Sequence, residues 1–315
     1  MRHLRTPGQV RPATPRGVFP LSRSRKAPPA VRYTPLRVAF AVLLIALWAG
    51  RLSLAGDVAG SAGPETIRDV VYACPGGYAL RTDIYRPGGA GPFPAVLCVH
   101  GGAWALGSKS QMVLIAGRLV SHGYAAVTID YRHAPQFLFP AQLEDCRAAL
   151  GWMLSNSRTY KLNRQRMGAW GYSAGAHLVT LMAFQAARES EKGGGKRTLR
   201  AVVAGGTPVD FRQFSEDSRI LAYWLGGSRR EKPQTYEAAS PARFVSAAAP
   251  PLFFYHGDSD SLVPIAPVKA LQNQLDALSV ATAMFVVPGA GHIGAFLDSA
   301  AMDRATAFLD KWLKE

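Results

Sequence analysis

The sequence predicts an α/β fold in which a mostly parallel central sheet of about eight strands carries helices on both faces. Segments typical of strands alternate with segments of helical spacing from residue 69 onwards. The run FPAVLCVHGG (93–102) is apolar throughout and ends in glycine, which is typical of a parallel strand buried on both faces.

The elements are expected in a regular order along the chain. Strands are expected at 69–74, 80–87, 93–102, 124–132, 166–172, 199–206, 251–257 and 282–289. The first two should pair antiparallel about the turn Pro75-Gly76-Gly77. Helices are expected at 108–122, 140–156, 174–188 and 302–314. The helix at 174–188 is apolar nearly all round, which predicts that it is buried.

Residues 207–247 interrupt this alternation. The segment is too long for an ordinary loop, and it contains several aromatic and aliphatic residues followed by a polar run. We expect a small insertion that packs over the functional site. The alternative is a set of helices that belongs only to the edge of the core.

The N-terminal part of the chain differs in composition from the predicted domain at 67–315. Residues 1–37 are rich in Arg and Pro and lack acidic residues, so we predict a disordered basic leader. The apolar run that follows has 13 residues, too few to span a bilayer but suited to a secretory signal. Residues 38–55 are therefore predicted as a signal sequence or signal anchor, and 56–66 as a linker.

This N-terminal prediction has consequences for localisation. We expect export, either periplasmic or secreted, or membrane association through residues 38–55. The alternatives are a true start downstream of Met1, or a dispensable N-terminus on a cytoplasmic enzyme. The sequence does not predict the oligomeric state.

The net charge of +15 belongs mostly to the leader. Ten of the 36 basic residues precede the first acidic residue, Asp57, which leaves 26 basic against 21 acidic residues, a net +5. No Lys/Arg run after Asp57 alternates with aromatic residues. The charge pattern therefore argues against nucleic-acid binding.

The cysteines indicate neither a disulfide framework nor a metal site. Their number is odd, and Cys98 lies in a predicted apolar strand while Cys146 lies in a predicted helix, with Cys74 as the third. Free thiols are expected, buried at least in these two elements. No CxxC or His-rich spacing suggests a metal, so no metal or organic cofactor is predicted.

Two motifs provide a candidate nucleophile and its anion-binding groups. GYSAG (171–175) lies between a predicted strand and a predicted helix, the context in which G-x-S-x-G places an exposed serine on a sharp turn. HGGAW (100–104) ends the strand at 93–99, and its glycines allow backbone N–H groups to approach a ligand closely. Alternative interpretations are two ordinary Gly turns.

Two further strand ends carry a candidate acid and base. HGDSDSLVP (256–264) contains Asp258 and Asp260, and either could orient an imidazole or merely cap a turn. GAGHIG (289–294) contains His292, which would be structural if considered alone. The order serine, aspartate, histidine, each after a strand, favours a catalytic role instead.

These motifs together resemble the α/β-hydrolase superfamily, and especially its hormone-sensitive-lipase-like and feruloyl-esterase-like (BD-FAE-type) carboxylesterases. The resemblance covers residues 67–315. HGGAW is similar to the HGGG-type loop of that group, with Ala103 in place of the third glycine. DYRHAPQFLFPAQLED (130–145) and GGSRREKPQTYEAASP (226–241) are also typical of these esterases.

The resemblance implies a role for each site residue. Ser173 matches the nucleophile, His292 the base and Asp260 the acid. The oxyanion donors are matched by Gly101, Gly102 and Ala174. We expect Trp104 and Tyr172 to line the substrate site. His100 and His177 are expected to be structural.

The predicted function is a serine carboxylesterase that hydrolyses small-acyl esters through an acyl-enzyme. Its partner would be a small-molecule ester. One alternative is an amide-cleaving serine hydrolase of the same fold, such as an arylformamidase or peptidase-like enzyme, because the shape of the acyl pocket cannot be read from the sequence. A non-catalytic receptor is disfavoured because all three members of the predicted triad are present.

Overall fold

The computed structural model describes residues 63–193 and 198–315. The predicted leader (1–37), the predicted signal segment (38–55) and most of the predicted linker (56–66) lie outside these residues. Within the described residues, no helix combines the length and the apolar character that a membrane crossing requires.

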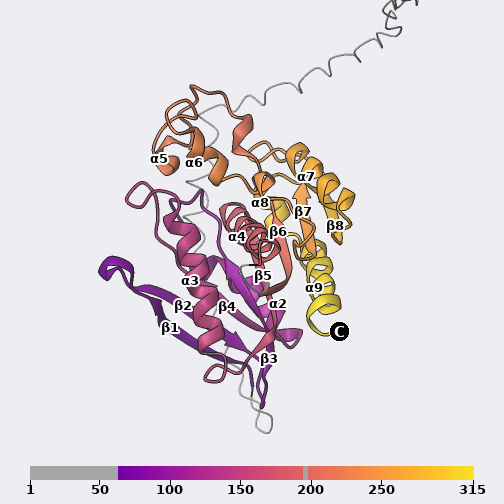
Figure 1. The fold of residues 1–315 in the computed structure, drawn as a ribbon. Coiled ribbons are helices and arrows are strands. Elements are labelled where there is room, and N and C mark those ends of the chain that lie inside the picture. The colour runs from indigo at the N-terminus through magenta and orange to yellow at the C-terminus, as the bar shows by residue number, and fades with distance from the viewer. Residues whose placement is uncertain (1–62, 194–197) are drawn as a thin grey trace, which may run out of the picture. The chain divides into compact units, whose positions relative to one another are not determined.

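Eight strands form one sheet in the order β1-β2-β4-β3-β5-β6-β7-β8 (Figure 1). The strands are β1 (Glu65–Ala73), β2 (Leu80–Arg86), β3 (Phe93–Val99), β4 (Ala125–Ile129), β5 (Leu162–Tyr172), β6 (Leu199–Gly205), β7 (Leu252–Gly257) and β8 (Thr282–Val287). β1 and β2 are antiparallel to their neighbours, and all strands from β3 to β8 run parallel. The predicted mostly parallel sheet of about eight strands is confirmed.

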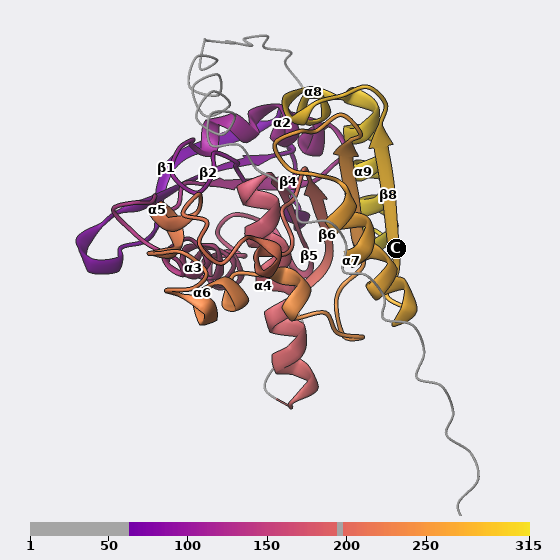
Figure 2. The same cartoon turned by 90° about the horizontal axis from the view of Figure 1, so that it is seen from above.

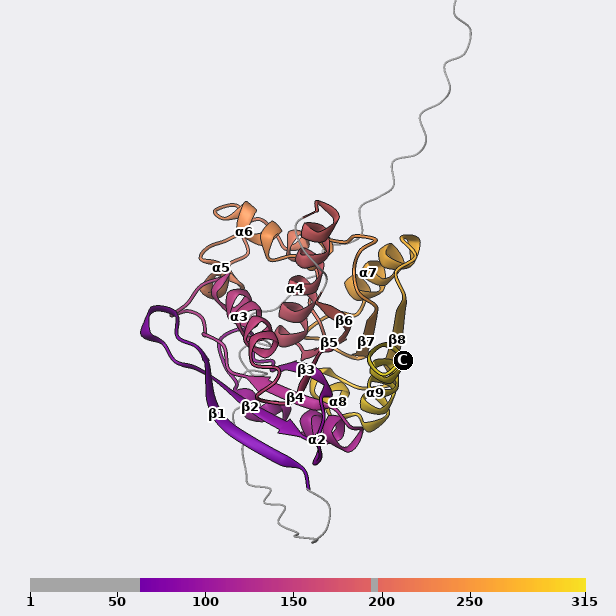
Figure 3. The same ribbon diagram turned by 60° about the horizontal axis from the view of Figure 1, so that its bottom comes forward.

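Helices cover both faces of the sheet, as Figures 2 and 3 show. One face packs against α3 (Ala141–Ser155), α4 (Ala174–Glu191) and α7 (Ala266–Ala277). The other packs against α2 (Val113–Ser121), α8 (His292–Leu297) and α9 (Ser299–Leu313). The sheet therefore has a hydrophobic core on each face, and successive side chains of β3 belong alternately to one core and the other. Leu97 and Val99 face α3 and α4, whereas Val96 and Cys98 face α2 and α9.

The observed elements differ from the predicted ones mainly at their ends. β1 begins at Glu65, two residues before the predicted start of the domain, and β5 begins at Leu162 rather than residue 166. Helices α7 and α8 were not predicted. The prediction of free cysteines is confirmed: Cys98 and Cys146 are buried, and Cys74 is exposed.

The segment at 207–247 lies between β6 and β7 and contains short helices. These are η3 (Phe211–Gln213), α5 (Ala222–Leu225), α6 (Pro233–Ala238) and η4 (Pro241–Arg243). Figure 1 shows α5 and α6 beyond the ends of the strands, above α3 and α4. The insertion therefore lies at the carboxyl ends of the parallel strands, where functional residues are expected in α/β folds.

Strand register places the loops that carry the candidate site residues at these carboxyl ends. Val99 at the end of β3 pairs with Gly171 in β5, and Gly257 at the end of β7 pairs with Val287 in β8. Because parallel strands end at the same edge, the loops after these four strands are neighbours.

Candidate active site

Ser173 occupies a sharp turn between β5 and α4. Its backbone has φ 53° and ψ −119°, a conformation that is unfavourable for a residue with a Cβ atom. A Cβ at Gly171 would lie 2.3 Å from the Gly175 backbone, and one at Gly175 would lie 2.0 Å from the Val99 oxygen. Both flanking glycines are therefore required by close backbone contact, as the sequence motif predicts.

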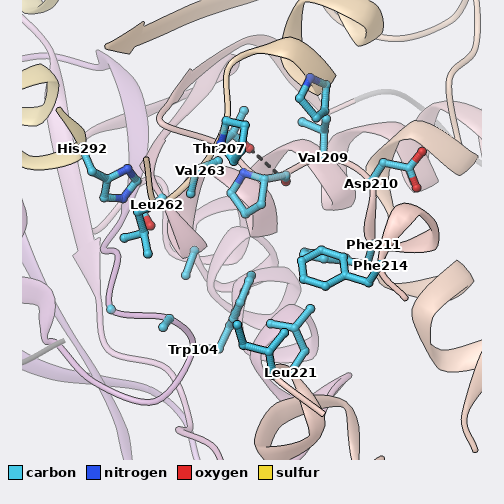
Figure 4. A pocket seen from close by; sticks show the side chains of 18 of the residues that line it. Trp104, Thr207, Val209, Asp210, Phe211, Phe214, Leu221, Leu262, Val263 and His292 are labelled. Atoms are coloured by element: carbon cyan, nitrogen blue, oxygen red, sulfur yellow. Dashed lines mark hydrogen bonds between the residues drawn. The ribbon is translucent and has the colours of Figure 1, made fainter. Parts of the chain in front are cut away.

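A largely apolar pocket opens beside this turn. Ser173 and His292 both line it, together with Gly102, Ala103 and Ala174. Its other walls come from the insertion and from the loop after β7, and they include Thr207, Val209, Phe211, Phe214, Ile220, Leu221, Tyr223, Leu262 and Val263. In the view of Figure 4, His292 stands at one side of the pocket, and Phe211 and Phe214 stand at the other.

His292 is oriented by Asp260. Its Nδ1 lies 2.6 Å from Asp260 Oδ2, and both side chains are buried. A carboxylate partner assigns the imidazole proton to Nδ1, which leaves Nε2 with its lone pair. Among the described residues, His292 Nε2 is buried and has no hydrogen-bond partner. His292 Nε2 is thus free to accept a proton, and His292 lines the same pocket as Ser173.

Asp260 is held in its ionised form. Burial by itself raises the pKa of this carboxyl. Hydrogen bonds from His256 and His292, together with the positive charge of His292 when it is protonated, outweigh that effect, so the pKa of Asp260 lies below the ordinary value. The other oxygen, Oδ1, accepts from the Leu262 and Val263 N–H groups at 2.9 and 2.8 Å.

His256 is a second histidine at this carboxylate, and the sequence reasoning missed it. Its Nε2 lies 3.3 Å from Asp260 Oδ2 and 2.7 Å from the Val263 carbonyl oxygen. The only signal in the sequence is its position four residues before Asp260 at the end of an apolar strand.

Asp258 has a different role from Asp260. Its Oδ1 accepts from the Gly289 N–H at 2.8 Å, which braces the loop after β7 against the loop after β8. Of the two aspartates left open by the sequence, only Asp260 contacts His292.

Three residues that line the pocket near Ser173, namely Gly102, Ala103 and Ala174, have backbone N–H groups available to bind an anion. Ala174 is the first residue of α4, where the helix offers its N–H no acceptor. Gly102 and Ala103 line the pocket, and within the described residues neither N–H donates a hydrogen bond. Gly101, predicted as a donor, does not line the pocket; a Cβ there would contact Ser173 Cβ at 3.2 Å. Of the three predicted donors, Gly102 and Ala174 line the pocket, and Ala103 is a further candidate that was not predicted.

Trp104 lies where the sequence predicts, and Tyr172 does not. Trp104 lines the pocket and stacks on Trp224, with ring centroids 3.7 Å apart. Tyr172 is buried behind the site, where its hydroxyl donates to the His292 carbonyl oxygen and its ring packs on Phe296. The reason is strand alternation: Tyr172 points to the same face of the sheet as Trp170, away from the pocket.

His100 and His177 are buried and neutral. His177 accepts from Trp104 Nε1 at 3.1 Å and donates through Nε2 to the Ala239 carbonyl oxygen at 2.7 Å. Burial lowers the pKa of His177 to about 4 and that of His100 to about 3. Both are structural, as expected. In the part of the chain that the structure describes, no group of three or more His, Cys, Asp or Glu side chains could hold a metal ion.

Comparison with known proteins gives consistent matches. The BD-FAE family model matches residues 82–275. The chain is 30% identical over 237 residues to the esterase LipQ of Mycobacterium tuberculosis (strain ATCC 25618 / H37Rv), a match that covers 71% of this chain and 56% of LipQ. It is 26% identical to an ethyl acetate hydrolase of Pseudomonas putida, over 75% of this chain and 78% of that enzyme.

A solved structure shares the fold. It is a truncated form of a carbohydrate esterase from gut microbiota, with a TM-score of 0.71 and 25% identity over 83% of this chain and 100% of that one. The chain spans little more than half the length of LipQ. Because the family match covers more than half of its residues, the chain belongs to the BD-FAE family of the α/β-hydrolase superfamily.

Proposed function

We propose that this protein hydrolyses carboxylic esters through an acyl-enzyme formed on Ser173. One observation carries the proposal: His292 donates from Nδ1 to Asp260 at 2.6 Å, while its buried Nε2 has no partner among the described residues. His292 and Ser173 line one pocket. A serine hydroxyl is a weak nucleophile until such a base takes its proton.

In the first half of the reaction, Ser173 Oγ attacks the ester carbonyl and its proton passes to His292 Nε2. The hydrogen bond between a nucleophile and its general base is often long until substrate binds. The imidazolium that forms is stabilised by Asp260, whose lowered pKa keeps it charged. His292 then gives the proton to the leaving alcohol, and the C–O bond of the ester breaks.

Negative charge develops on the carbonyl oxygen during the attack. We assign its stabilisation to the N–H groups of Gly102, Ala103 and Ala174, which border the pocket beside Ser173. Preorganised donors of this type contribute about 3–4 kcal/mol each to transition-state stabilisation. In the second half of the reaction, His292 takes a proton from the water that attacks the acyl-enzyme carbonyl. It returns this proton to Ser173 Oγ as the acyl C–Oγ bond breaks and the acid leaves.

The substrate would meet an apolar pocket wall. Trp104, Phe211 and Leu221 line the pocket with bulky apolar side chains. The similar enzyme from Pseudomonas putida is an ethyl acetate hydrolase, and the similar structure is a carbohydrate esterase. We therefore propose short-chain esters as substrates, including acetyl groups on carbohydrates.

A substrate panel tests this function. Wild type and Ser173→Ala are assayed on acetyl, butyryl and octanoyl p-nitrophenyl esters and on an N-formyl aryl amide. The proposal predicts that the wild type cleaves the acetyl and butyryl esters fastest and that Ser173→Ala has no measurable activity. Equal activity of the two proteins would reject the role of Ser173, and preferential cleavage of the amide would reject the substrate class.

We further propose export or membrane anchoring through residues 38–55, which lie outside the described residues. The support is the apolar run of 13 residues between Arg37 and Arg51. Cell fractionation with N-terminal sequencing tests this proposal. A soluble cytoplasmic protein with an intact Met1 would overturn it.

A further inference from the structure

A side-chain hydrogen bond connects the insertion to the backbone of the loop that carries the Gly102 and Ala103 N–H groups. The hydroxyl of Tyr223, in α5, donates to the Ala103 carbonyl oxygen at 2.9 Å. The two residues are 120 positions apart in the sequence. Burial raises the pKa of Tyr223, so the hydroxyl keeps the proton that it donates.

This loop has a backbone conformation that needs support. Ala103 and Trp104 have φ values of 51° and 59°, in the left-handed region that disfavours residues with a Cβ atom. In the related HGGG-type loops a glycine would take this position at no such cost. The contacts around Ala103 must therefore hold its conformation against the alternatives.

Other contacts hold the residues on either side of Ala103. The Gly102 carbonyl oxygen accepts from the Ala105 and Leu106 N–H groups at 3.0 and 2.9 Å. Trp104 is fixed by its stacking on Trp224 and by its hydrogen bond to His177. Because Tyr223 and Trp224 are adjacent in α5, one turn of the insertion holds two successive residues of the loop.

We propose that Tyr223 is a positioning residue for the oxyanion site: by holding the Ala103 carbonyl, it directs the Gly102 and Ala103 N–H groups into the pocket. The insertion then contributes to transition-state stabilisation as well as covering the pocket. This inference rests on the ester hydrolysis proposed above. It predicts an effect on the charged transition state and not on the neutral substrate, because the oxyanion forms only during the attack.

Tyr223→Phe is the test variant, and Tyr236→Phe is its matched control. Tyr223→Phe keeps the ring that lines the pocket and removes only the donor. Tyr236 belongs to the same insertion, is buried, and donates to the Gly227 carbonyl oxygen at 3.2 Å, but it does not line the pocket. Steady-state kinetics on p-nitrophenyl acetate are measured for both variants and for the wild type.

The expected result is a split between kcat and KM. Tyr223→Phe should lower kcat and kcat/KM together by about tenfold or more, with KM changed by less than about twofold. Tyr236→Phe should leave kcat within about twofold of the wild type. An active wild type with unchanged kcat in Tyr223→Phe would overturn this inference and leave the proposed function standing, whereas an inactive wild type would overturn the proposed function itself.

A pair of inhibitors separates positioning from packing. An alkylthio trifluoromethyl ketone accepts Ser173 Oγ at its carbonyl carbon and forms a hemiketal oxyanion, while the serine proton passes to His292. The matched methyl ketone binds without that charge. Tyr223→Phe should raise Ki for the trifluoromethyl ketone by about the factor lost in kcat/KM, with Ki for the methyl ketone nearly unchanged.

The ratio of the two Ki values reports on folded molecules only, because an unfolded chain binds neither ketone. Equal weakening of both ketones would show that the hydroxyl supports pocket shape alone, and this would overturn the inference. It therefore stays testable even if Tyr223→Phe is less stable than the wild type.

Discussion

His292 Nδ1 lies 2.6 Å from Asp260 Oδ2, although the two residues are 32 positions apart in the sequence. The contact follows from the sheet. β7 and β8 are adjacent and parallel, with Gly257 paired to Val287, so the loops that follow them leave the same edge side by side. Each loop then presents one titratable side chain to the other.

Replacing Asp260 with Asn should nearly abolish activity. The amide presents no anion to the imidazolium and favours the wrong tautomer of His292, so kcat should fall by about 10³–10⁴-fold. Asp258→Asn is the matched control, since its side-chain oxygen can still accept from the Gly289 N–H. Initial rates on p-nitrophenyl acetate measure both, and equal losses in the two variants would contradict the assignment of Asp260.

The strand ends and their motifs were predictable from the sequence because each depends on local pattern. A serine between two glycines at a strand-to-helix junction and an Asp-x-Asp after an apolar strand need no knowledge of distant packing. Tyr172 was also within reach of the sequence. Period-two alternation places it with Trp170, away from the pocket, so its prediction as a substrate-lining residue was wrong.

Other features depend on long-range packing. The Tyr223–Ala103 hydrogen bond requires the path of the insertion, which no local pattern encodes. The His256–Asp260 contact is local in the sequence, but it depends on the geometry of the turn after β7, which brings His256 Nε2 to 3.3 Å from Asp260 Oδ2. A histidine inside an apolar strand gives no indication of which group it will meet.

Ala103→Gly should make the protein slightly more stable. At φ 51° a glycine avoids the Cβ strain, while its greater freedom in the unfolded chain offsets part of the gain. We expect a net increase of about 0.5 kcal/mol in the free energy of unfolding. Urea denaturation measures it beside Ala183→Gly in the interior of α4, which should lose about 1 kcal/mol. A loss of the same size in both variants would argue against strain at Ala103.

The buried histidines should make stability fall in mild acid. Burial lowers the pKa of His177 from 6.5 to about 4 in the folded protein. Between these values the unfolded chain binds the proton and the folded protein does not, so stability rises with pH by up to about 1.4 kcal/mol per pH unit for this residue. The stability that neutral His177 contributes to the folded protein is therefore lost as the pH falls from 6.5 toward 4.

His177→Gln tests this pH dependence. Glutamine keeps one acceptor for Trp104 Nε1 and one donor for the Ala239 carbonyl, but it does not titrate. Urea unfolding between pH 7 and 4.5 should show a smaller loss of stability for the variant than for the wild type. Parallel curves for the two proteins would mean that His177 does not contribute to the acid sensitivity.

Ile220→Ala should extend the range of acyl chains that the enzyme accepts. Ile220 lines the pocket from the insertion, and its truncation to Ala enlarges the pocket at that wall. The ratio of kcat/KM for butyryl to acetyl p-nitrophenyl ester should rise by about tenfold. Leu278→Ala, at an exposed position outside the pocket, is the control and should leave the ratio unchanged. An unchanged ratio in Ile220→Ala would mean that the acyl group binds in a part of the pocket that Ile220 does not contact.

The most direct test of the proposed mechanism is to trap the acyl-enzyme on Ser173. Wild type, Ser173→Ala and Asp258→Asn are mixed with p-nitrophenyl acetate, quenched in acid and examined by peptide mass spectrometry. We predict one acetyl group on the peptide that contains Ser173 in the wild type and in Asp258→Asn, and none on the corresponding peptide of Ser173→Ala. Ester hydrolysis by Ser173→Ala at the wild-type rate, or an acetyl group found on another residue in all three proteins, would contradict the proposed mechanism.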